Sequence, residues 1–428
     1  MLKLDKQKKF DYKWVIVALS FLMVMVCLGF CSSGKSLYTV AITKALDIKR
    51  SSFSINDSCR FVSTAIINMF FGSLVARFGT KKLIGAGFLC LITSCLVYSV
   101  ATSVWVFCIG GVLLGVGLSW TTTTMVGSII NKWCKENKGT IMGAVLAANG
   151  IGGAIATQII TPIIYEEGNA FGYQNAYRLS AIILLVVGIL IMLFYKEKPK
   201  RPEDIQSIVH KKKARGEGWV GIEFKTACKR PYFYVALLCI FVTGMTLQGL
   251  GGIATPHLQE VGLDIGFIAG MVSLHSLFLA GFKFLTGFIY DKKGLRTTMN
   301  ICMVTAIVVM IMLALVKNTA TGKVLVSVYE IFSSLALPLE TIMLPIYANE
   351  LFGQKSFDKI LGLFVSVNTA GYALGAPLAN ICFDFFGSYK GAILAGALLM
   401  LLVIILMQFV VSIAAKEKQK ILMQNNVE

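Results

Sequence analysis

Long apolar runs, separated by short polar and basic segments, occupy most of this 428-residue chain. A run of at least about 18 apolar residues is long enough to cross the hydrocarbon core of a bilayer as a helix. Such runs lie at about 14–43, 53–76, 83–101, 104–130, 139–164, 178–195, 232–256, 265–290, 297–316, 323–349, 359–386 and 390–414. The pattern predicts an all-α polytopic membrane protein with twelve transmembrane helices.

One charged segment, residues 196–230, interrupts the apolar pattern and divides the spans six and six. We therefore expect an N-terminal six-helix bundle at 1–195 and a C-terminal six-helix bundle with a cytoplasmic tail at 231–428. The segment between them is expected to be a basic linker that remains in water, although contact with anionic headgroups is an alternative. The first apolar run is too long for the core of a signal peptide and no cleavage site follows it, so it predicts a retained first span.

Composition and charge support this class and predict its orientation. Hydrophobic residues make up 56% of the chain and charged residues 14%, which is more apolar surface than a soluble fold can bury. With the N-terminus in the cytoplasm, 30 of the 40 Lys and Arg residues lie in cytoplasmic segments, 7 in external loops and 3 inside spans. The positive-inside rule then places both termini in the cytoplasm. The net charge of +18 follows from this distribution and does not indicate a nucleic-acid partner.

The chain contains no pattern typical of catalysis, metal binding or a cofactor. Its eleven cysteines are scattered through apolar runs without metal-ligand spacing. The glycine-rich stretch 147–154 has no preceding strand and no following lysine, so it predicts helix packing and not a nucleotide loop. No partner is visible for His257 or His275, which we expect to be structural. We therefore expect no enzyme activity, no metal and no cofactor, and a monomer in a bacterial plasma membrane.

A short basic turn occurs twice, after the second apolar run of each half. The second copy contains Gly287, Asp291, Lys292, Gly294 and Arg296, and the first contains Gly72, Arg77 and Gly79, with Ala76 at the acid position. Two copies at matching places indicate an internal duplication. The first glycine of each copy allows close approach of two helices, and the second allows a turn with positive φ. This pattern resembles the loop motif of the major facilitator superfamily, which implies the fold of that family and a gating role for both turns.

Five charged residues inside the predicted spans stand out, because a charge in the hydrocarbon costs at least about 2.5–3.5 kcal/mol on insertion scales. They are Lys35, Arg60, Lys283, Glu330 and Glu340. Because Lys35 and Lys283 lie in different halves, they could hold a carboxylate between the bundles. Snorkelling or a structural ion pair is the alternative for both lysines. Arg60 could instead pair with Asp57, three residues earlier on the same helix.

The tenth span carries both acidic residues and two prolines. Glu330 and Glu340 are ten residues apart, which places them about 80° apart around a helix axis. Pro338 and Pro345 predict a kink in this span. Glu340 could carry a proton or balance Lys283, and a purely structural counter-ion is an equal alternative.

Short patches also resemble the monocarboxylate transporters and the related oxalate/formate antiporters. These patches are Gly34-Lys35-Ser36, residues 131–143, residues 283–287 and residues 384–389. The resemblance implies that Lys283 stands where those carriers have an arginine, so the charge is kept while bidentate geometry is lost. Leu279 stands where the proton-coupled carriers have an aspartate, and Asn368 where the oxalate antiporters have a lysine. Proton symport through that aspartate and a two-lysine clamp in the C-terminal half are therefore not expected.

Together these observations predict a secondary transporter that moves a small organic anion, a mono- or dicarboxylate, by alternating access. The residues expected to bind substrate are Lys35, Lys283, Tyr38, Asn149, Gln248 and Asn368. Those expected to couple or to balance charge are Glu340, Glu330 and Arg60, with a proton or a counter-anion as the second transported species. Two alternatives remain open, a carrier for another solute such as an amphipathic drug, and a non-transporting nutrient sensor on the same fold.

Overall fold

The computed structural model describes residues 12–33, 35–48, 50–134, 136–166, 169, 171–197 and 221–425. The N-terminal half contains α1 (Lys13–Leu28), a π-helical turn (Gly29–Ser33), α2 (Lys35–Ala45), α3 (Arg50–Met69), α4 (Phe71–Phe78), α5 (Thr80–Val100), α6 (Val104–Thr121), α7 (Thr123–Trp133), α8 (Lys138–Ile164) and α9 (Gly172–Phe194). The C-terminal half contains α11 (Phe224–Ala227), α12 (Pro231–Glu260), α13 (Ile265–Ala314), α14 (Ala320–Ala336), α15 (Pro338–Thr341), α16 (Met343–Phe352), α17 (Phe357–Phe386) and α18 (Lys390–Asn425). In the described residues the chain is helical apart from short connections and one isolated β-bridge.

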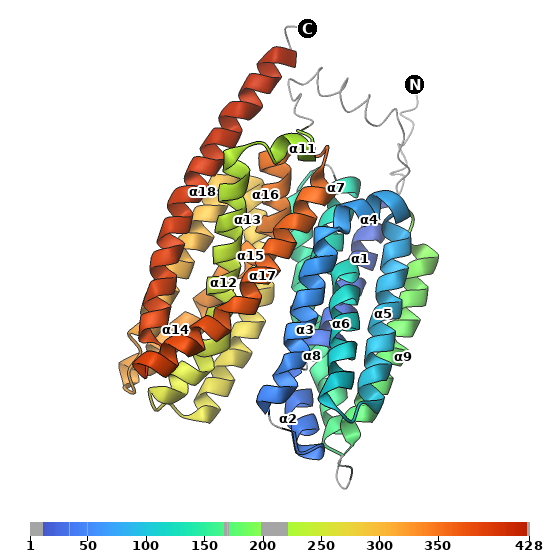
Figure 1. The fold of residues 1–428 in the computed structure, drawn as a ribbon, viewed down its shortest axis with the longest axis vertical. Coiled ribbons are helices and arrows are strands. Elements are labelled where there is room, and N and C mark those ends of the chain that lie inside the picture. The colour runs from blue at the N-terminus through green and yellow to red at the C-terminus, as the bar shows by residue number, and fades with distance from the viewer. Residues whose placement is uncertain are drawn as a thin grey trace, which may run out of the picture.

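The helices form two bundles that lie side by side (Figure 1). Helices α1–α9 make one bundle and α12–α18 make the other. Both ends of the described chain lie at the same end of the molecule, together with α4, α7, α11 and α16. We call this end the terminal face and the opposite end the distal face. Residues 198–220 of the predicted linker lie outside the described part of the chain.

The twelve predicted spans can be followed in the described helices. Ten helices are long and apolar enough to cross a membrane, and the pair Ile55–Met69 and Phe71–Phe78, bent by 60°, forms an eleventh span. Helix α13 is 50 residues long but contains one non-helical residue, Gly294, with φ 78° and ψ 179°. Gly294 therefore separates the two predicted spans at 265–290 and 297–316. The all-helical polytopic fold is confirmed.

Several spans differ in detail from the continuous helices that the apolar pattern predicts. The fourth span breaks at Thr122, between α6 and α7. The tenth span breaks before Pro338, which starts the short helix α15 because proline fits the first turn of a helix and interrupts a longer one. Leu337, at this break, keeps α-helical dihedrals (φ −61°, ψ −27°), so the kink predicted for this span stays a prediction. The last helix continues to Asn425, past the predicted end at 414, and Arg230 pairs with Glu417 at 2.5 Å on this extension.

Glycines bring the helices into close contact. Gly152 of α8 packs against the carbonyl of Met25 in α1, and Gly115 of α6 packs against the carbonyl of Arg60 in α3. A methyl group at either position would overlap the neighbouring backbone. The glycine-rich stretch of α8 therefore serves helix packing, as predicted.

The described end of the linker is attached to the C-terminal bundle. The backbone N–H of Ile222 donates to the carbonyl of Phe352 at 3.0 Å. Glu223 pairs with Lys355 at 2.9 Å, and this contact lowers the pKa of the Glu223 carboxyl group. The linker is thus fixed to the turn 353–356, directly before α17.

Candidate functional site

Lys283 is a buried cation in α13, four residues before Gly287. Its side chain is 5% exposed, and its ammonium group forms no hydrogen bond or ion pair within the part of the chain that the structure describes. It lies close enough to Glu340 for the two charges to interact. The backbone carbonyl of Lys283 packs against Gly143 of α8. The backbone of Lys283 therefore lies at the boundary between the two bundles, and its side chain has no direct partner among the described residues.

Glu340 lies on α15, the four-residue helix that Pro338 begins, and is 4% exposed. The side-chain amide of Gln248 in α12 donates to Glu340 Oε2 at 2.9 Å. Tyr372 of α17 lies near the same carboxyl group, whose Oε1 has no hydrogen-bond partner among the described residues. Three helices of the C-terminal bundle thus converge on one buried acid. Gln248 was predicted to contact substrate and Glu340 to balance charge, and the structure places them in direct contact.

Glu330 has a partner that the sequence reasoning missed. His275 Nδ1 lies 3.5 Å from Glu330 Oε2, and 3.0 Å from both the Glu330 carbonyl and Ser333 Oγ. The sequence showed no partner for His275, which was expected to be structural, and the structure supplies one. The sequence offered one signal that His275 belongs to this group of charges. His275 precedes Lys283 by eight residues, so the two lie about 80° apart around the same helix. The charges of these two residues are close enough to interact.

Arg60 and Tyr38 lie together in the N-terminal bundle, in a pocket with a free volume of about 30 Å³. The ring of Tyr38 stacks on Tyr177, with 4.0 Å between the centroids. The guanidinium carbon of Arg60 lies 4.6 Å from the ring centroid of Phe61. Phe61 in turn meets Tyr372 of the other bundle edge-on at 6.1 Å. This contact links the aromatic pocket of one bundle to the Glu340 cluster of the other.

The remaining predicted substrate residues occupy different places. Lys35 begins α2, directly after the π-helical turn, and its side chain lies outside the described atoms. Asn149 is half-buried on α8. Asn368 is 2% exposed, and its amide donates to the carbonyl of Ile240 at 3.1 Å, so it ties α17 to α12. Substrate contact by these three residues stays a prediction.

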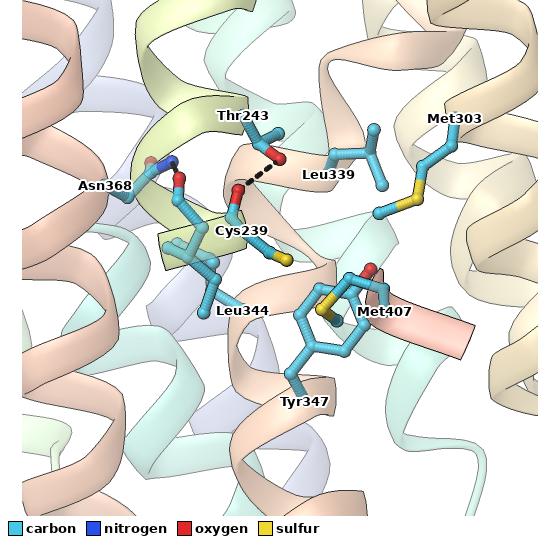
Figure 2. A pocket seen from close by; sticks show the side chains of 9 residues that line it. Cys239, Thr243, Met303, Leu339, Leu344, Tyr347, Asn368 and Met407 are labelled. Atoms are coloured by element: carbon cyan, nitrogen blue, oxygen red, sulfur yellow. Dashed lines mark hydrogen bonds between the residues drawn. The ribbon is translucent and has the colours of Figure 1, made fainter. Parts of the chain in front are cut away.

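Figure 2 shows Asn368 at the edge of a small cavity inside the C-terminal bundle. The side chains around it include those of Cys239, Met303, Tyr347 and Met407. Its free volume of about 10 Å³ is close to the least that a single water molecule needs. This cavity is therefore a packing defect and not a solute site.

His257, expected to be structural, contacts the carbonyl of Leu313 at 3.1 Å.

The second copy of the basic turn joins the bundles at the terminal face. The Asp291 carboxylate accepts hydrogen bonds from the backbone N–H groups of Gly139 at 3.1 Å and Thr140 at 2.6 Å. These N–H groups are in the first turn of α8, where helix geometry leaves them without partners and concentrates partial positive charge. Gly287 packs against the carbonyl of Gly139, and a side chain on either glycine would overlap backbone. The first glycine of the turn therefore allows close helix contact, as predicted.

The first copy joins the bundles by a different route. Gly72 packs against the backbone of Lys359 in α17. Position 76 is alanine, and the ion pair at this side is formed instead by Lys132 of α7 and Asp358 of α17, at 3.1 Å. Gly79 has φ +81°, so the predicted positive φ is confirmed at this position as it is at Gly294.

The bases of the two turns make local contacts. Arg77 lies over the ring of Phe78 at 5.4 Å, and Lys292 over the ring of Phe288 at 4.4 Å. Arg296 donates to Ser412 Oγ at 2.9 Å, which links the turn to α18. These contacts keep the bases at the terminal face.

The described residues contain no group of three or more His, Cys, Asp and Glu side chains arranged to hold a metal ion. The structure instead combines two helical bundles, glycine-lined contacts between them, and buried charges within the spans. This combination is typical of a secondary membrane transporter. The family model of the Major Facilitator Superfamily matches residues 17–346, and the chain belongs to this family.

Known proteins of the family resemble the chain at low identity. Multidrug resistance protein 2 of Bacillus subtilis (strain 168) is 24% identical over 332 residues, which cover 76% of this chain and 78% of the relative. The hexuronate transporter of the same organism is 25% identical over 382 residues, which cover 83% and 85%. The crystal structure of the transporter FucP in the outward conformation has a TM-score of 0.69 at 16% identity and covers 93% of this chain and 99% of that one. The fold and the transporter class are thus established, and the named substrates of the relatives differ.

Proposed function

We propose that this transporter carries a small organic anion, a mono- or dicarboxylate, by alternating access, with Lys283 as the cation that holds it. The observation that carries the proposal is the buried side chain of Lys283, for which no ion pair or hydrogen bond to another described residue is found. A charge withdrawn from water is costly unless an opposite charge joins it. A substrate carboxylate would supply that charge. Lys35 in the other half is the candidate for a second contact.

Glu340 is the candidate for coupling. When its carboxyl group is ionised, Glu340 partly balances the charge of Lys283, and a substrate anion gains less on binding. When the carboxyl group is protonated, Lys283 lacks that balance and attracts the anion more strongly. Proton and anion would then bind favourably together, which is the thermodynamic requirement for symport. Glu330 with His275 is a second acid–base pair in the same bundle, available to transfer the proton.

We further propose that the terminal face is cytoplasmic and that the protein resides in a bacterial plasma membrane. This orientation places thirty Lys and Arg residues in cytoplasmic segments and seven in external loops, as the positive-inside rule requires. The inter-bundle contacts of Gly72, Gly287 and Asp291 lie at the terminal face, so this conformation would be closed to the cytoplasm. The short patches similar to monocarboxylate transporters and oxalate/formate antiporters, and a relative named for hexuronate, support a carboxylate substrate.

The test is thermal stabilisation of the purified protein by a panel of mono- and dicarboxylates, followed by uptake into proteoliposomes. Lys283→Gln should lower apparent affinity by about 30-fold or more, because removing one side of a buried charge contact typically costs 2 kcal/mol or more. Lys283→Arg keeps the charge and is the matched control, so it should retain part of the stabilisation.

The outcomes separate the alternatives. Stabilisation by carboxylates that Lys283→Gln loses would support the anion site. Stabilisation only by amphipathic cations or neutral solutes would overturn it in favour of a drug carrier. Saturable carboxylate binding without flux would identify a sensor. Full uptake by Lys283→Gln would exclude Lys283 from the substrate site.

A further inference from the structure

A large apolar cavity opens on the side of the C-terminal bundle, between α12, α17 and α18. Its free volume is about 320 Å³, far larger than the cavity beside Asn368 or the pocket beside Arg60. That volume is about twice the 150 Å³ of an engineered apolar cavity that stays dry and binds benzene. Its lining residues belong to the helices that form spans 7, 9, 11 and 12.

The chemistry of the lining selects a hydrocarbon. Its members are aliphatic side chains, methionines and glycines, with Thr246 and Cys382 as the two exceptions. The Thr246 hydroxyl already donates to the carbonyl of Val242 at 2.8 Å, so it requires no ligand partner. Among the side chains that the structure describes, none that lines the cavity is charged. A polar solute would lose its hydration here without replacement, whereas an alkyl chain would lose nothing.

The mouth of the cavity is continuous with the lipid-facing surface. Leu378 and Ile381 of α17 line the cavity and are 45% and 49% exposed. On α18, Leu398 is an exposed large apolar residue next in sequence to the lining residue Leu399. Exposed apolar side chains along membrane-spanning helices face acyl chains of the bilayer. The cavity is thus an indentation in the protein–lipid interface, and the nearest available ligand is a lipid tail.

We propose that this cavity is a specific lipid site, which takes one acyl chain of a membrane phospholipid between α17 and α18. The chain would lie against Gly249 and Gly375, where α12 and α17 pack backbone to backbone. The next residue of α12 before Gly249 is Gln248, whose amide holds Glu340. An occupied cavity therefore supports the α12–α17 contact beside the buried acid. Only this link to transport rests on the proposed function, and lipid binding does not.

Gly396 offers a way to fill the cavity without disturbing its walls. A Cβ atom on Gly396 would meet Met310 Sδ at 3.7 Å and a methyl carbon of Thr246 at 3.9 Å, both ordinary contacts. Gly396→Leu should place its side chain in the volume that the acyl chain would occupy. Gly391→Leu is the matched control, because Gly391 is on the same helix and a Cβ there meets nothing within 4 Å. Ala395→Leu, at another lining position, is a second filling variant should Gly396→Leu not accumulate.

The experiment is photocrosslinking of the full chain in bilayers that contain a phospholipid with a diazirine in its acyl tail, with the labelled peptides mapped by mass spectrometry. In wild type and Gly391→Leu, labelling of residues 378–382 and 392–399 should saturate at one lipid and be competed by unlabelled lipid. Gly396→Leu or Ala395→Leu should reduce it by about tenfold, because the filled cavity no longer buries the chain's apolar surface. Labelling around Leu402 should not change.

Two results would overturn the proposal. One is equal labelling of these peptides in the filling variants and wild type, or labelling that does not saturate, since either describes ordinary annular lipid. The other is saturable labelling by a diazirine fatty acid, detergent or amphipathic drug together with none by the phospholipid, which would assign the cavity to a single-chain amphiphile. Because the readout is lipid binding, loss of carboxylate uptake would not affect it.

Discussion

The ionisable residues of the C-terminal bundle form two acid–base pairs of different kinds. His275 and Glu330 are within 3.5 Å of each other, whereas Lys283 and Glu340 interact through their charges without an ion pair. In an apolar region the strength of such an interaction falls slowly with distance, because little water screens it. The protonation state of Glu340 can therefore control how strongly Lys283 attracts an anion. Gln248 keeps the carboxyl group in place in either state.

Glu340→Gln tests this coupling directly. In the wild type, uptake of the carboxylate should rise as pH falls, because protonation of Glu340 removes the negative charge near Lys283. Glutamine is permanently neutral, so the variant should bind the anion equally well at high and low pH and lose the pH dependence of uptake. The measurement is initial uptake and thermal stabilisation across a pH series, with Glu330→Gln in parallel. A pH profile identical to wild type would remove Glu340 from the mechanism.

Sequence reasoning located these charges but could not pair them. A lysine or glutamate in a long apolar run stands out because insertion is costly, and Lys283, Glu330 and Glu340 are all buried in the structure. Pairing depends on how three helices rotate and approach, and periodicity on one helix does not encode that. His275 was missed for this reason, since its partner is on α14.

Helix contacts in this protein depend on glycine positions that only the packed structure reveals. The lengths of the spans, the break at Pro338 and the positive φ of Gly79 and Gly294 follow from local residue preferences and were predictable. The break at Thr122 and the extension of α18 to Asn425 could not be predicted in this way. A run of apolar residues indicates which segment lies in the lipid, but it does not show where a helix breaks or how far it continues. The partner of each glycine likewise depends on the fold as a whole.

Gly287→Ala should weaken closure at the terminal face. The added methyl group would overlap the Gly139 backbone, and overpacking of this kind costs about 1–3 kcal/mol, or roughly 5- to 150-fold in the population of the closed state. Gly281→Ala is the control on the same helix, because a Cβ there meets nothing within 4 Å. The measurement is the fraction of molecules in which the two bundles are separated at the terminal face, read from a distance between probes on the two bundles. Equal distributions in the two variants would show that the contact does not determine closure.

At the scale of the whole molecule, the two halves close against each other by unequal means. The second turn places Asp291 at the start of α8, whereas the first has Ala76 and relies on Lys132 with Asp358. Two equivalent turns would give two equivalent closures, but the first turn has Ala76 where the second has Asp291. In these two turns, Asp291 is therefore the charged residue that contacts a helix N-terminus of the other bundle.

Asp291→Asn should therefore shift the molecule towards separation at the terminal face. An anion at a helix N-terminus contributes about 0.3–2 kcal/mol, which corresponds to roughly 2- to 30-fold in the ratio of the two states. Probes at Lys82 and Lys293, both exposed at the terminal face, would report the distance between the bundles. The variant should show a larger long-distance population, and Ala76→Asp should oppose it if the new carboxylate reaches the start of α17. An unchanged distance distribution in Asp291→Asn would mean that the glycine contacts hold the halves together without the Asp291 carboxylate. Asp291 would then not affect the ratio of closed to separated states.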